Sequence, residues 1–414
     1  MTTIVDRGGA LWIEGVALED VAARHGTPCF VYSRAALTAA YREFATAFAG
    51  LRHLICYALK ANSNLAVLDV FARLGSGFDV VSGGELARVI AAGCDPRKVV
   101  FSGVGKTDAE LSQGLDLGIF CFNVESASEL EHLSRVAEQS GKAAPVSLRV
   151  NPDVDARTHP FIATGLKQSK FGVAFDEALE LYRRAASLPG IAIRGIDIHI
   201  GSQITELEPY KLATTKLLAL VDRLVDEGIR LEHIDLGGGF GIRYRDEVPI
   251  DLAELASMIA ALFRGRPEML VVEPGRRLTG DAGVLLTRVS YLKPGSERSF
   301  AIVDAAMNDL LRPALYDAWH EVRPVRPRNQ TPRAWQIVGP VCESADFLAH
   351  DRVLALAEGD LLAILSAGAY AMAMSSNYNS RPRAAEVLVD GDTMHLVGRR
   401  ESVGELFARE TRLP

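Results

Sequence analysis

The chain has 414 residues, of which 48% are hydrophobic and 23% charged, and its formal net charge is −7. This composition is ordinary for a soluble globular protein, and the length allows one large domain and a smaller one. The sequence has no basic run with interleaved aromatic residues, which argues against a nucleic-acid partner.

The sequence also argues against export and membrane insertion. Its first residues lack the basic, apolar and small-residue regions of a signal peptide. The longest apolar run, 361–374, is shorter than the roughly 20 residues of a bilayer-spanning helix. The five cysteines show neither metal-ligand spacing nor a disulfide framework, and Cys56 and Cys121 lie in apolar runs where a buried thiol is usual. We therefore expect a cytoplasmic protein with no metal site.

From about residue 50 the sequence alternates short apolar runs with amphipathic stretches. Several of these apolar runs are rich in Val and Ile with little alternation, which is typical of parallel strands buried on both faces. Candidate strands cover 53–60, 78–82, 99–103, 119–124, 146–151, 195–201, 233–239 and 269–273. Candidate helices include 84–92, 127–140, 175–187, 211–227 and 252–263. This repetition predicts an eightfold β/α barrel, although periodicity alone also allows a doubly wound open sheet.

After Gly275 the pattern changes to short apolar runs separated by Pro and Gly turns, which is typical of antiparallel strands. These runs lie at 283–291, 299–303, 334–338, 360–365 and 385–389. Two strand-like segments near the start, 11–13 and 29–32, are expected to pair with them. We therefore predict an α/β protein with an eightfold β/α barrel at 31–275 and a mainly antiparallel β domain formed by 1–30 and 276–414.

Polar residues collect at the predicted C-terminal ends of the barrel strands, where barrel enzymes carry their working groups. Lys60 ends the first of these strands. Most lysines are solvated on the surface, but an amine at the end of a buried strand is partly desolvated, which favours the neutral form that builds a Schiff base. His199 ends another strand, and on its own it is equally well interpreted as a hydrogen-bonded core histidine.

Two loops and a serine suggest a binding site for a phosphate group. The glycines at 237–239 follow a strand, but they lack the spacing of a dinucleotide-binding fingerprint because residue 242 is Ile. Such a cluster forms either a tight turn or a loop whose N–H groups close around a phosphate. The loop 273–276 adds an arginine, and Ser202 adds a hydroxyl. Together they predict a site for one phosphorylated cofactor rather than a nucleotide.

The segment 102–107 resembles the end of a nucleotide-binding P-loop, but position 100 is Val where that motif requires Gly. We therefore interpret Lys106, Thr107 and Asp108 as the start of a helix and not as an ATP site.

Several motifs, in their order and content, resemble those of the diaminopimelate decarboxylase family. They lie at 57–62, 199–203, 237–241, 273–276, 339–344, 368–370 and 376–381, and the resemblance runs from near residue 25 to near residue 395. That family belongs to the alanine racemase-like, fold type III enzymes that use pyridoxal 5'-phosphate (PLP). The resemblance implies a PLP-dependent carboxy-lyase of lysine biosynthesis that converts meso-2,6-diaminopimelate to L-lysine and carbon dioxide.

The resemblance also implies how PLP is held. Lys60 would carry the cofactor, His199 would stack on the pyridine face opposite the substrate, and Glu273 would keep the pyridine nitrogen protonated. These roles are chemically consistent, because a protonated pyridine stabilises the carbanion that decarboxylation leaves and a carboxylate beside the nitrogen keeps its proton in place. Cofactor contacts are further implied for Ser202, Gly237, Gly238, Gly239, Gly275, Arg276 and Tyr370.

A second set of residues is implied for the substrate. Diaminopimelate carries a carboxylate and an ammonium at its far end, and arginine binds a carboxylate through two parallel hydrogen bonds. Arg312 and Tyr316 share one face if 310–316 is helical, although from the residues alone Arg312 and Glu343 are equally well interpreted as solvated. The resemblance assigns substrate contacts to Arg276, Arg312, Tyr316 and Tyr370, with Glu343 on the distal ammonium.

The family resemblance further implies a homodimer with shared active sites. Cys342 would reprotonate the carbanion, and Cys342 and Glu343 would enter the partner subunit's site. From the sequence alone, Cys342 is alternatively a buried structural thiol.

Other functions stay open at this point. A decarboxylase of another basic amino acid, or an amino-acid racemase on the same scaffold, would keep Lys60 and the cofactor loops without preferring a distal carboxylate. A non-catalytic PLP carrier would keep Lys60 but would have no use for Cys342 and Glu343.

Overall fold

The computed structural model describes residues 3–155 and 170–414, and the chain divides into two compact units. One consists of Ala40–Ile242 and Glu247–Arg277, and the other of Met1–Ala39, Arg243–Asp246 and Leu278–Pro414. We call the first the barrel unit and the second the β unit. Within the described ranges, no helix has both the length and the apolar character needed to cross a membrane.

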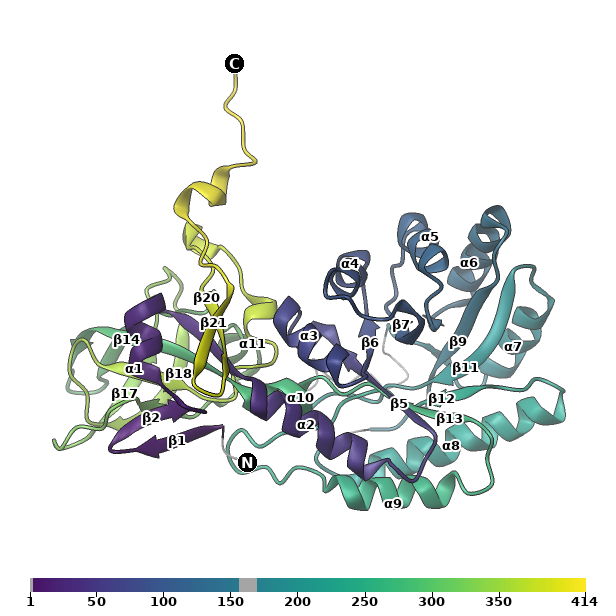
Figure 1. Ribbon diagram of the computed structural model, residues 1–414, viewed down its shortest axis with the longest axis horizontal. Helices are drawn as coiled ribbons and strands as arrows, with labels where there is room; N and C mark the ends of the chain where they lie inside the picture. Colours follow the sequence, from purple (N-terminus) through teal and green to yellow (C-terminus); the bar gives the residue numbers. More distant parts are fainter. Residues whose placement is uncertain (1–2, 156–169) are drawn as a thin grey trace. The chain divides into compact units, whose positions relative to one another are not determined.

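Eight parallel strands close into a barrel in the barrel unit (Figure 1). They are β5 (His53–Ala58), β6 (Gly77–Val80), β7 (Val99–Phe101), β8 (Cys121–Val124), β9 (Ala144–Asn151), β11 (Ile191–Asp197), β12 (His233–Asp235) and β13 (Met269–Val272). Each pairs with the next in chain order, and β13 pairs with β5. The short strand β10 (Val173–Ala174) pairs with β9. The predicted eightfold β/α barrel is confirmed, and the open sheet is wrong because β8 and β9 pair and leave no gap.

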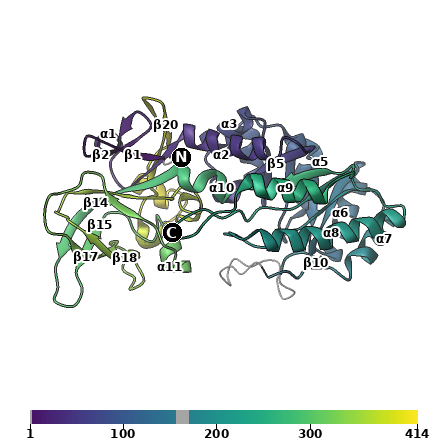
Figure 2. The same ribbon diagram turned by 90° about the horizontal axis from the view of Figure 1, so that it is seen from below.

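Helices lie on the outside of these strands (Figure 1). They are α3 (Leu65–Arg73), α4 (Gly83–Ala91), α5 (Asp108–Leu117), α6 (Ala127–Ser140), α7 (Ala178–Ser187), α8 (Leu207–Asp226) and α9 (Leu252–Leu262), and α2 (Arg34–Ala47) precedes the first strand. Helices α8 and α9 lie side by side (Figure 2). Each helix buries an apolar stripe; in α8, Leu217, Val221 and Leu224 repeat at helical spacing and are buried.

The start of α5 settles the interpretation of 102–107. Thr107 is the N-cap residue, and its hydroxyl accepts a hydrogen bond from the backbone N–H of Glu110. The ammonium of Lys106 is buried and lies 2.7 Å from Glu129 Oε1. The predicted helix start is confirmed, and Lys106 is bound within the protein.

The strand that precedes Lys60 is shorter than predicted. It ends at Ala58, and the next three residues form a 3-10 turn, η1 (Leu59–Ala61). Leu59 is fully buried although it has left the sheet, so hydrophobicity continues past the last residue of the strand. Lys60 and His199 therefore lie in the segments that directly follow β5 and β11.

The β unit contains a nine-stranded, mainly antiparallel sheet. Its main path runs β18 (Phe347–Leu354), β17 (Arg333–Val338), β15 (Phe300–Val303), β14 (Gly283–Lys293), β4 (Cys29–Ser33), β20 (Ala385–Asp390) and β21 (Thr393–Gly398). Strand β19 (Leu361–Ile364) also pairs with β14, and β16 (Val322–Pro324) pairs with β19. The predicted antiparallel region is confirmed, and so is the pairing of 29–32 with it, because β4 pairs with β14 and β20.

The other N-terminal segment, 11–13, does not join that sheet. It belongs to β2 (Ala10–Ile13), which pairs with β1 (Ile4–Arg7) and β3 (Val16–Ala17) in a separate three-stranded sheet. Leu11 N–H donates to Val325 O at 2.9 Å, and Leu11 and Ile13 share one apolar core with residues of β14 and β20. The prediction was wrong about sheet pairing, because an apolar strand is buried equally well by packing against a sheet face.

Candidate active site

Lys60 is held by a buried carboxylate. Its Nζ lies 2.6 Å from Asp79 Oδ2, and the Asp79 side chain on β6 is fully buried. The turn that carries Lys60 is fixed by the Tyr57 hydroxyl, which donates to Asn62 O at 2.7 Å. The buried negative charge stabilises the ammonium form. The amine must therefore give up a proton before it acts as a nucleophile, and Asp79 lies within hydrogen-bond distance to accept it.

Glu273 lies directly after β13 in a group of three buried acids. One carboxylate oxygen from each of Asp197, Asp235 and Glu273 lies within 4.8 Å of the others. Glu273 is 5% exposed, and its Oε1 has no hydrogen-bond partner among the described residues. Burial raises the pKa of Glu273 well above its usual range, and the negative charges of Asp235, Asp79 and Asp197 add to the rise.

Sequence reasoning missed Asp79, Asp197 and Asp235. Each lies in an apolar strand of the barrel and is at most 1% exposed. A carboxylate inside a run of Val, Ile and Leu is the signal that was available, because a buried charge is rare unless it is paired or functional.

His199 is a neutral, fixed ring. Its Nδ1 accepts a hydrogen bond from Gly238 N–H at 3.1 Å. Burial lowers the pKa of His199 well below its usual range, and the positive charges of Arg149 and Lys60 lower it further. The ring therefore carries its proton on Nε2 at neutral pH.

Glycine is required at positions 237–239 because neighbouring segments pack closely against this loop. Gly237 and Gly239 have φ angles of +67° and +93°. A Cβ atom at Gly238 would lie 2.2 Å from Glu273 O, and one at Gly239 would lie 2.4 Å from Gly201 O. The loops after β11, β12 and β13 thus meet at distances that only glycine permits. The N–H groups of Gly237 and Gly238 donate to Asp235 and His199, so they orient those side chains.

Arg276 and Ser202 come together in the barrel unit and form a hydrogen bond. Arg276 begins the short helix α10 (Arg276–Thr279) and is 7% exposed. Its Nη2 donates to Ser202 Oγ at 2.9 Å. A Cβ at Gly275 would lie 3.1 Å from Ala61 Cβ, so the loop carrying Glu273 and Arg276 passes directly beside the Lys60 turn. The barrel unit therefore brings all of its predicted site residues to one set of strand ends.

In the β unit, Arg312 is buried and braced. It begins α11 (Arg312–Tyr316), so the helix that was needed to align Arg312 with Tyr316 is present. Arg312 is 6% exposed, its Nη1 lies 2.8 Å from His320 Nε2, and its guanidinium lies 4.3 Å from the centre of the Tyr244 ring. The interpretation of Arg312 as a solvated surface residue is wrong.

Cys342 and Glu343 lie on an exposed loop after β17. The loop is anchored by Asn379 Oδ1, which accepts from Cys342 N–H at 2.7 Å, and by Asp346 Oδ2, which accepts from Val341 N–H at 2.8 Å. Two motifs that are distant in sequence, 339–344 and 376–381, are therefore in contact. The interpretation of Cys342 as a buried thiol is wrong, because its thiol faces solvent in this chain.

Tyr370 follows β19 with a φ of +53°, a strained conformation that is frequent at functional sites. A Cβ at Gly368 would lie 1.9 Å from Thr279 O, so the 368–370 segment packs against the backbone that follows α10. Close packing thus fixes the segment that presents Tyr370.

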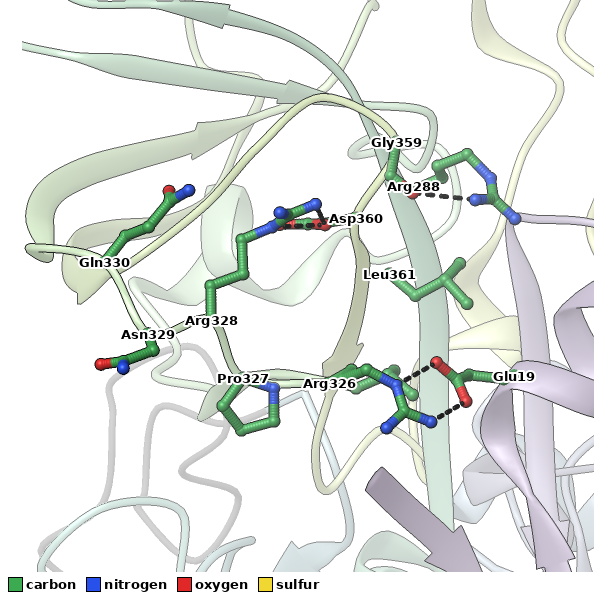
Figure 3. A pocket seen from close by; sticks show the side chains of 11 residues that line it. Glu19, Arg288, Arg326, Pro327, Arg328, Asn329, Gln330, Gly359, Asp360 and Leu361 are labelled. Carbon is green, nitrogen blue, oxygen red and sulfur yellow. Dashed lines mark hydrogen bonds and ion pairs between the residues drawn. The ribbon is translucent and has the colours of Figure 1, made fainter. Parts of the chain in front are cut away.

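A cavity of about 510 Å³ in the β unit contains none of the predicted site residues. Figure 3 shows that its arginines are engaged within the protein: Arg326 binds Glu19, Arg328 binds Asp360, and Arg288 donates to Gly359 O. The cavity therefore offers guanidinium groups whose charge is largely compensated.

The barrel geometry defines a class of protein. Lys60 offers an amine to an aldehyde, Arg276 and Ser202 offer donors to a phosphate, and the unpartnered Glu273 Oε1 offers a buried acceptor to a ring N–H. This donor set fits PLP. The fold and site are those of a β/α-barrel enzyme that uses PLP.

The comparisons with known proteins define the family. The family described as "Pyridoxal-dependent decarboxylase, pyridoxal binding domain" matches residues 34–280. A diaminopimelate decarboxylase of Pseudomonas aeruginosa is 60% identical over all of both chains. The diaminopimelate decarboxylase of Helicobacter pylori complexed with L-lysine is 41% identical with a TM-score of 0.92, covering 95% of this chain and 99% of that one. The enzyme of M. jannaschii in complex with L-lysine is 36% identical with a TM-score of 0.95, covering 100% and 98%. The chain belongs to the diaminopimelate decarboxylase family of PLP-dependent decarboxylases.

Proposed function

We propose that this protein decarboxylates meso-2,6-diaminopimelate to L-lysine and carbon dioxide with PLP as its cofactor. The observation that carries the proposal is the convergence of the Lys60 amine, the Arg276–Ser202 pair and the Glu273 carboxyl at neighbouring strand ends of the barrel. The substrate assignment is supported by full-length relatives named diaminopimelate decarboxylase and by two solved relatives named as complexes with L-lysine.

The barrel residues would hold the cofactor. When bound, PLP supplies an electron sink for the carbanion that loss of carbon dioxide leaves. Lys60 Nζ would bind it covalently, His199 would support one face of the ring, and Glu273 would hold a proton at the pyridine nitrogen. Contacts to the rest of the cofactor would come from Ser202, Gly237, Gly238, Gly239, Gly275, Arg276 and Tyr370.

The neutral state of His199 suits a stacking role. A charged imidazolium against the ring would compete with the pyridine nitrogen for the electrons of the carbanion, whereas a neutral ring supports it without doing so. The hydrogen bond from Gly238 N–H to Nδ1 fixes the plane of the imidazole. His199 therefore orients the cofactor and does not act as an acid at neutral pH.

The distal carboxylate of the substrate needs a positively charged partner that is held in place. Arg312 meets this need, because His320 and Tyr244 hold its guanidinium in place before any ligand arrives, and preorganised donors lose little entropy on binding. We assign the distal carboxylate to Arg276, Arg312 and Tyr316, with a contribution from Tyr370. Glu343 is assigned to the distal ammonium.

We further propose that the enzyme is a homodimer in which Cys342 and Glu343 serve the partner subunit's site, with Cys342 as the proton donor to the carbanion. Support comes from their exposure in a single chain. A proton donor that reacts at a carbanion works best where water is excluded, and these two residues are not covered by their own loop. A cytoplasmic location is proposed from the cysteine usage of the sequence.

The function is tested by supplying purified protein with meso-diaminopimelate, ornithine, arginine and alanine while following carbon dioxide and products. We expect lysine and carbon dioxide from diaminopimelate. Lys60→Ala should abolish covalent, borohydride-reducible cofactor attachment and lower activity by about 10³-fold or more. Lys211→Ala, which removes an exposed lysine of α8, is the control and should behave as wild type. Preferential turnover of ornithine or arginine, or racemisation of alanine, would instead support the related enzymes on this scaffold.

A further inference from the structure

Two of the buried acids near Lys60 form no ion pair with any residue that the structure describes. Asp79 is paired with Lys60 at 2.6 Å, and Asp197 lies 3.9 Å from Arg149. Among the residues that the structure describes, no ion pair is made by Asp235 or Glu273, although both are nearly inaccessible to solvent. Asp235 Oδ1 accepts from Gly237 N–H at 2.8 Å, whereas Asp235 Oδ2 and Glu273 Oε1 have no partner there.

The surrounding groups relieve this pair only in part. The positive charge of Lys60 lowers the pKa of both Asp235 and Glu273, but Lys60 is already paired with Asp79, and burial outweighs its effect. Arg149 is shared with Glu125, whose Oε1 lies 3.3 Å from it, so its charge is already compensated. The thiols of Cys56 and Cys121 also lie near, and burial raises the pKa of each well above its usual range, which keeps both neutral. Two adjacent carboxylates without a cation repel each other and are poorly solvated, so one proton between them is strongly favoured.

We propose that Asp235 and Glu273 share a proton in the cofactor-free protein and deliver it to the pyridine nitrogen of PLP when the cofactor binds. The proposal rests on the placement of that nitrogen at Glu273 in the proposed function. An O–H bond of the pair breaks and an N–H bond at the ring forms, so the pair gains one negative charge and the ring one positive charge. Asp235 is then a positioning residue, which acts on the cofactor through Glu273.

The groups around Asp235 and Glu273 favour a proton that is retained on the pair. Burial and neighbouring carboxylates raise the pKa of both Asp235 and Glu273, which favours retention of a proton at neutral pH. After transfer, the same negative charges stabilise the protonated ring. The arrangement thus lets the site bind a neutral pyridine and convert it to the cation without taking a proton from solvent.

The proton is observed directly by infrared difference spectroscopy of the full-length protein, freed of cofactor and then titrated with PLP. Wild type should lose the carbonyl stretch of a protonated carboxylic acid when PLP binds. Asp235→Asn should show no such loss, because the new amide keeps the acceptor for Gly237 N–H and donates to Glu273, which stabilises the carboxylate before PLP arrives. Asp197→Asn should keep the loss, because it leaves both members of the proposed pair, Asp235 and Glu273, in place.

Absence of the acid band from wild type would overturn the proposal, as would a loss that persists in Asp235→Asn but vanishes in Asp197→Asn. Glu273→Gln separates this failure from failure of the proposed function. It should weaken PLP binding by roughly tenfold or more through loss of one charge-assisted hydrogen bond. Unchanged PLP affinity would refute the placement of the ring nitrogen, whereas weakened affinity without an acid band in wild type would refute the shared proton alone.

Discussion

The barrel unit and the β unit present their candidate site residues in opposite environments. In the barrel unit, Lys60 is paired with Asp79 and His199 is held by Gly238 N–H. Burial shifts the pKa of both His199 and Glu273 toward their neutral forms. In the β unit, Cys342 and Glu343 lie exposed on a loop whose backbone is anchored but whose side chains face solvent. Under the proposed function, the barrel residues would provide most of the cofactor contacts, while Cys342 and Glu343 would act only once they are covered.

Arg312 is an exception to this contrast in exposure between the two units. It belongs to the β unit, yet it is as buried as Arg276 of the barrel unit. Both guanidinium groups are oriented by a side-chain contact, Arg276 by Ser202 and Arg312 by His320. The two arginines proposed to bind anions are thus held in place by the protein itself, whereas the proposed proton donor and its neighbouring acid are exposed. This contrast is what a site completed by a second subunit would produce.

The comparison is tested most severely by mixing inactive variants. Lys60→Ala and Cys342→Ala should each be nearly inactive alone. If the loop serves the partner's barrel, a mixed dimer has one site with both changes and one with neither. About half of the dimers would be mixed, so activity should return to roughly a quarter of wild type after subunit exchange.

The control for the mixing experiment is Lys60→Ala mixed with Glu273→Gln, both in the barrel unit. Each site of that mixed dimer carries one change, so activity should stay low. If subunit exchange is shown independently and Lys60→Ala with Cys342→Ala still recovers nothing, the loop acts within its own chain or not at all.

Arg312→Ala sharpens the comparison at the substrate end. The variant should raise KM for diaminopimelate by roughly 10- to 150-fold, the effect of losing one charge-assisted contact. Covalent cofactor attachment should be retained, because that step belongs to the barrel residues. Arg328→Ala removes an arginine of the cavity in Figure 3 and should leave KM unchanged. An unaltered KM in Arg312→Ala, with the fold verified by its melting temperature, would remove Arg312 from substrate recognition.

Much of the barrel was predictable, because buried parallel strands leave a strong local signal. All eight predicted apolar runs contain a strand of the observed barrel. Strand β21 was not predicted; it is short, and none of its residues is fully buried. The separate sheet of β1 to β3 was missed for another reason: pairing partners depend on the packing of whole layers, which a short segment does not encode.

The candidate site was predictable as a set of residue types but not as a network. Lys60, His199 and the glycine loop were visible because strand ends and glycine clusters are sequence features. The pairing of Lys60 with Asp79 depends on the registration of two strands, and the close approach of Asp235 to Glu273 depends on the closure of the barrel. The glycines were expected to bind phosphate; the structure adds that a Cβ there would strike the neighbouring loops.

The smallest predicted effect concerns the stability of the cofactor-free protein. Burial raises the pKa of Asp235 from 3.8 to about 7, so between these values the folded state binds more protons than the unfolded state. The free energy of unfolding therefore falls as pH rises through this window, and the destabilisation caused by ionised Asp235 is complete above it. Asp235→Asn removes the cost, and its gain in melting temperature should be larger at pH 8 than at pH 5, with roughly 2 to 4 °C for each kcal/mol recovered. The exposed control Asp116→Asn should change the melting temperature little at either pH. Differential scanning calorimetry measures both, and a gain that is equal at the two pH values would show that Asp235 does not change its protonation state in this window.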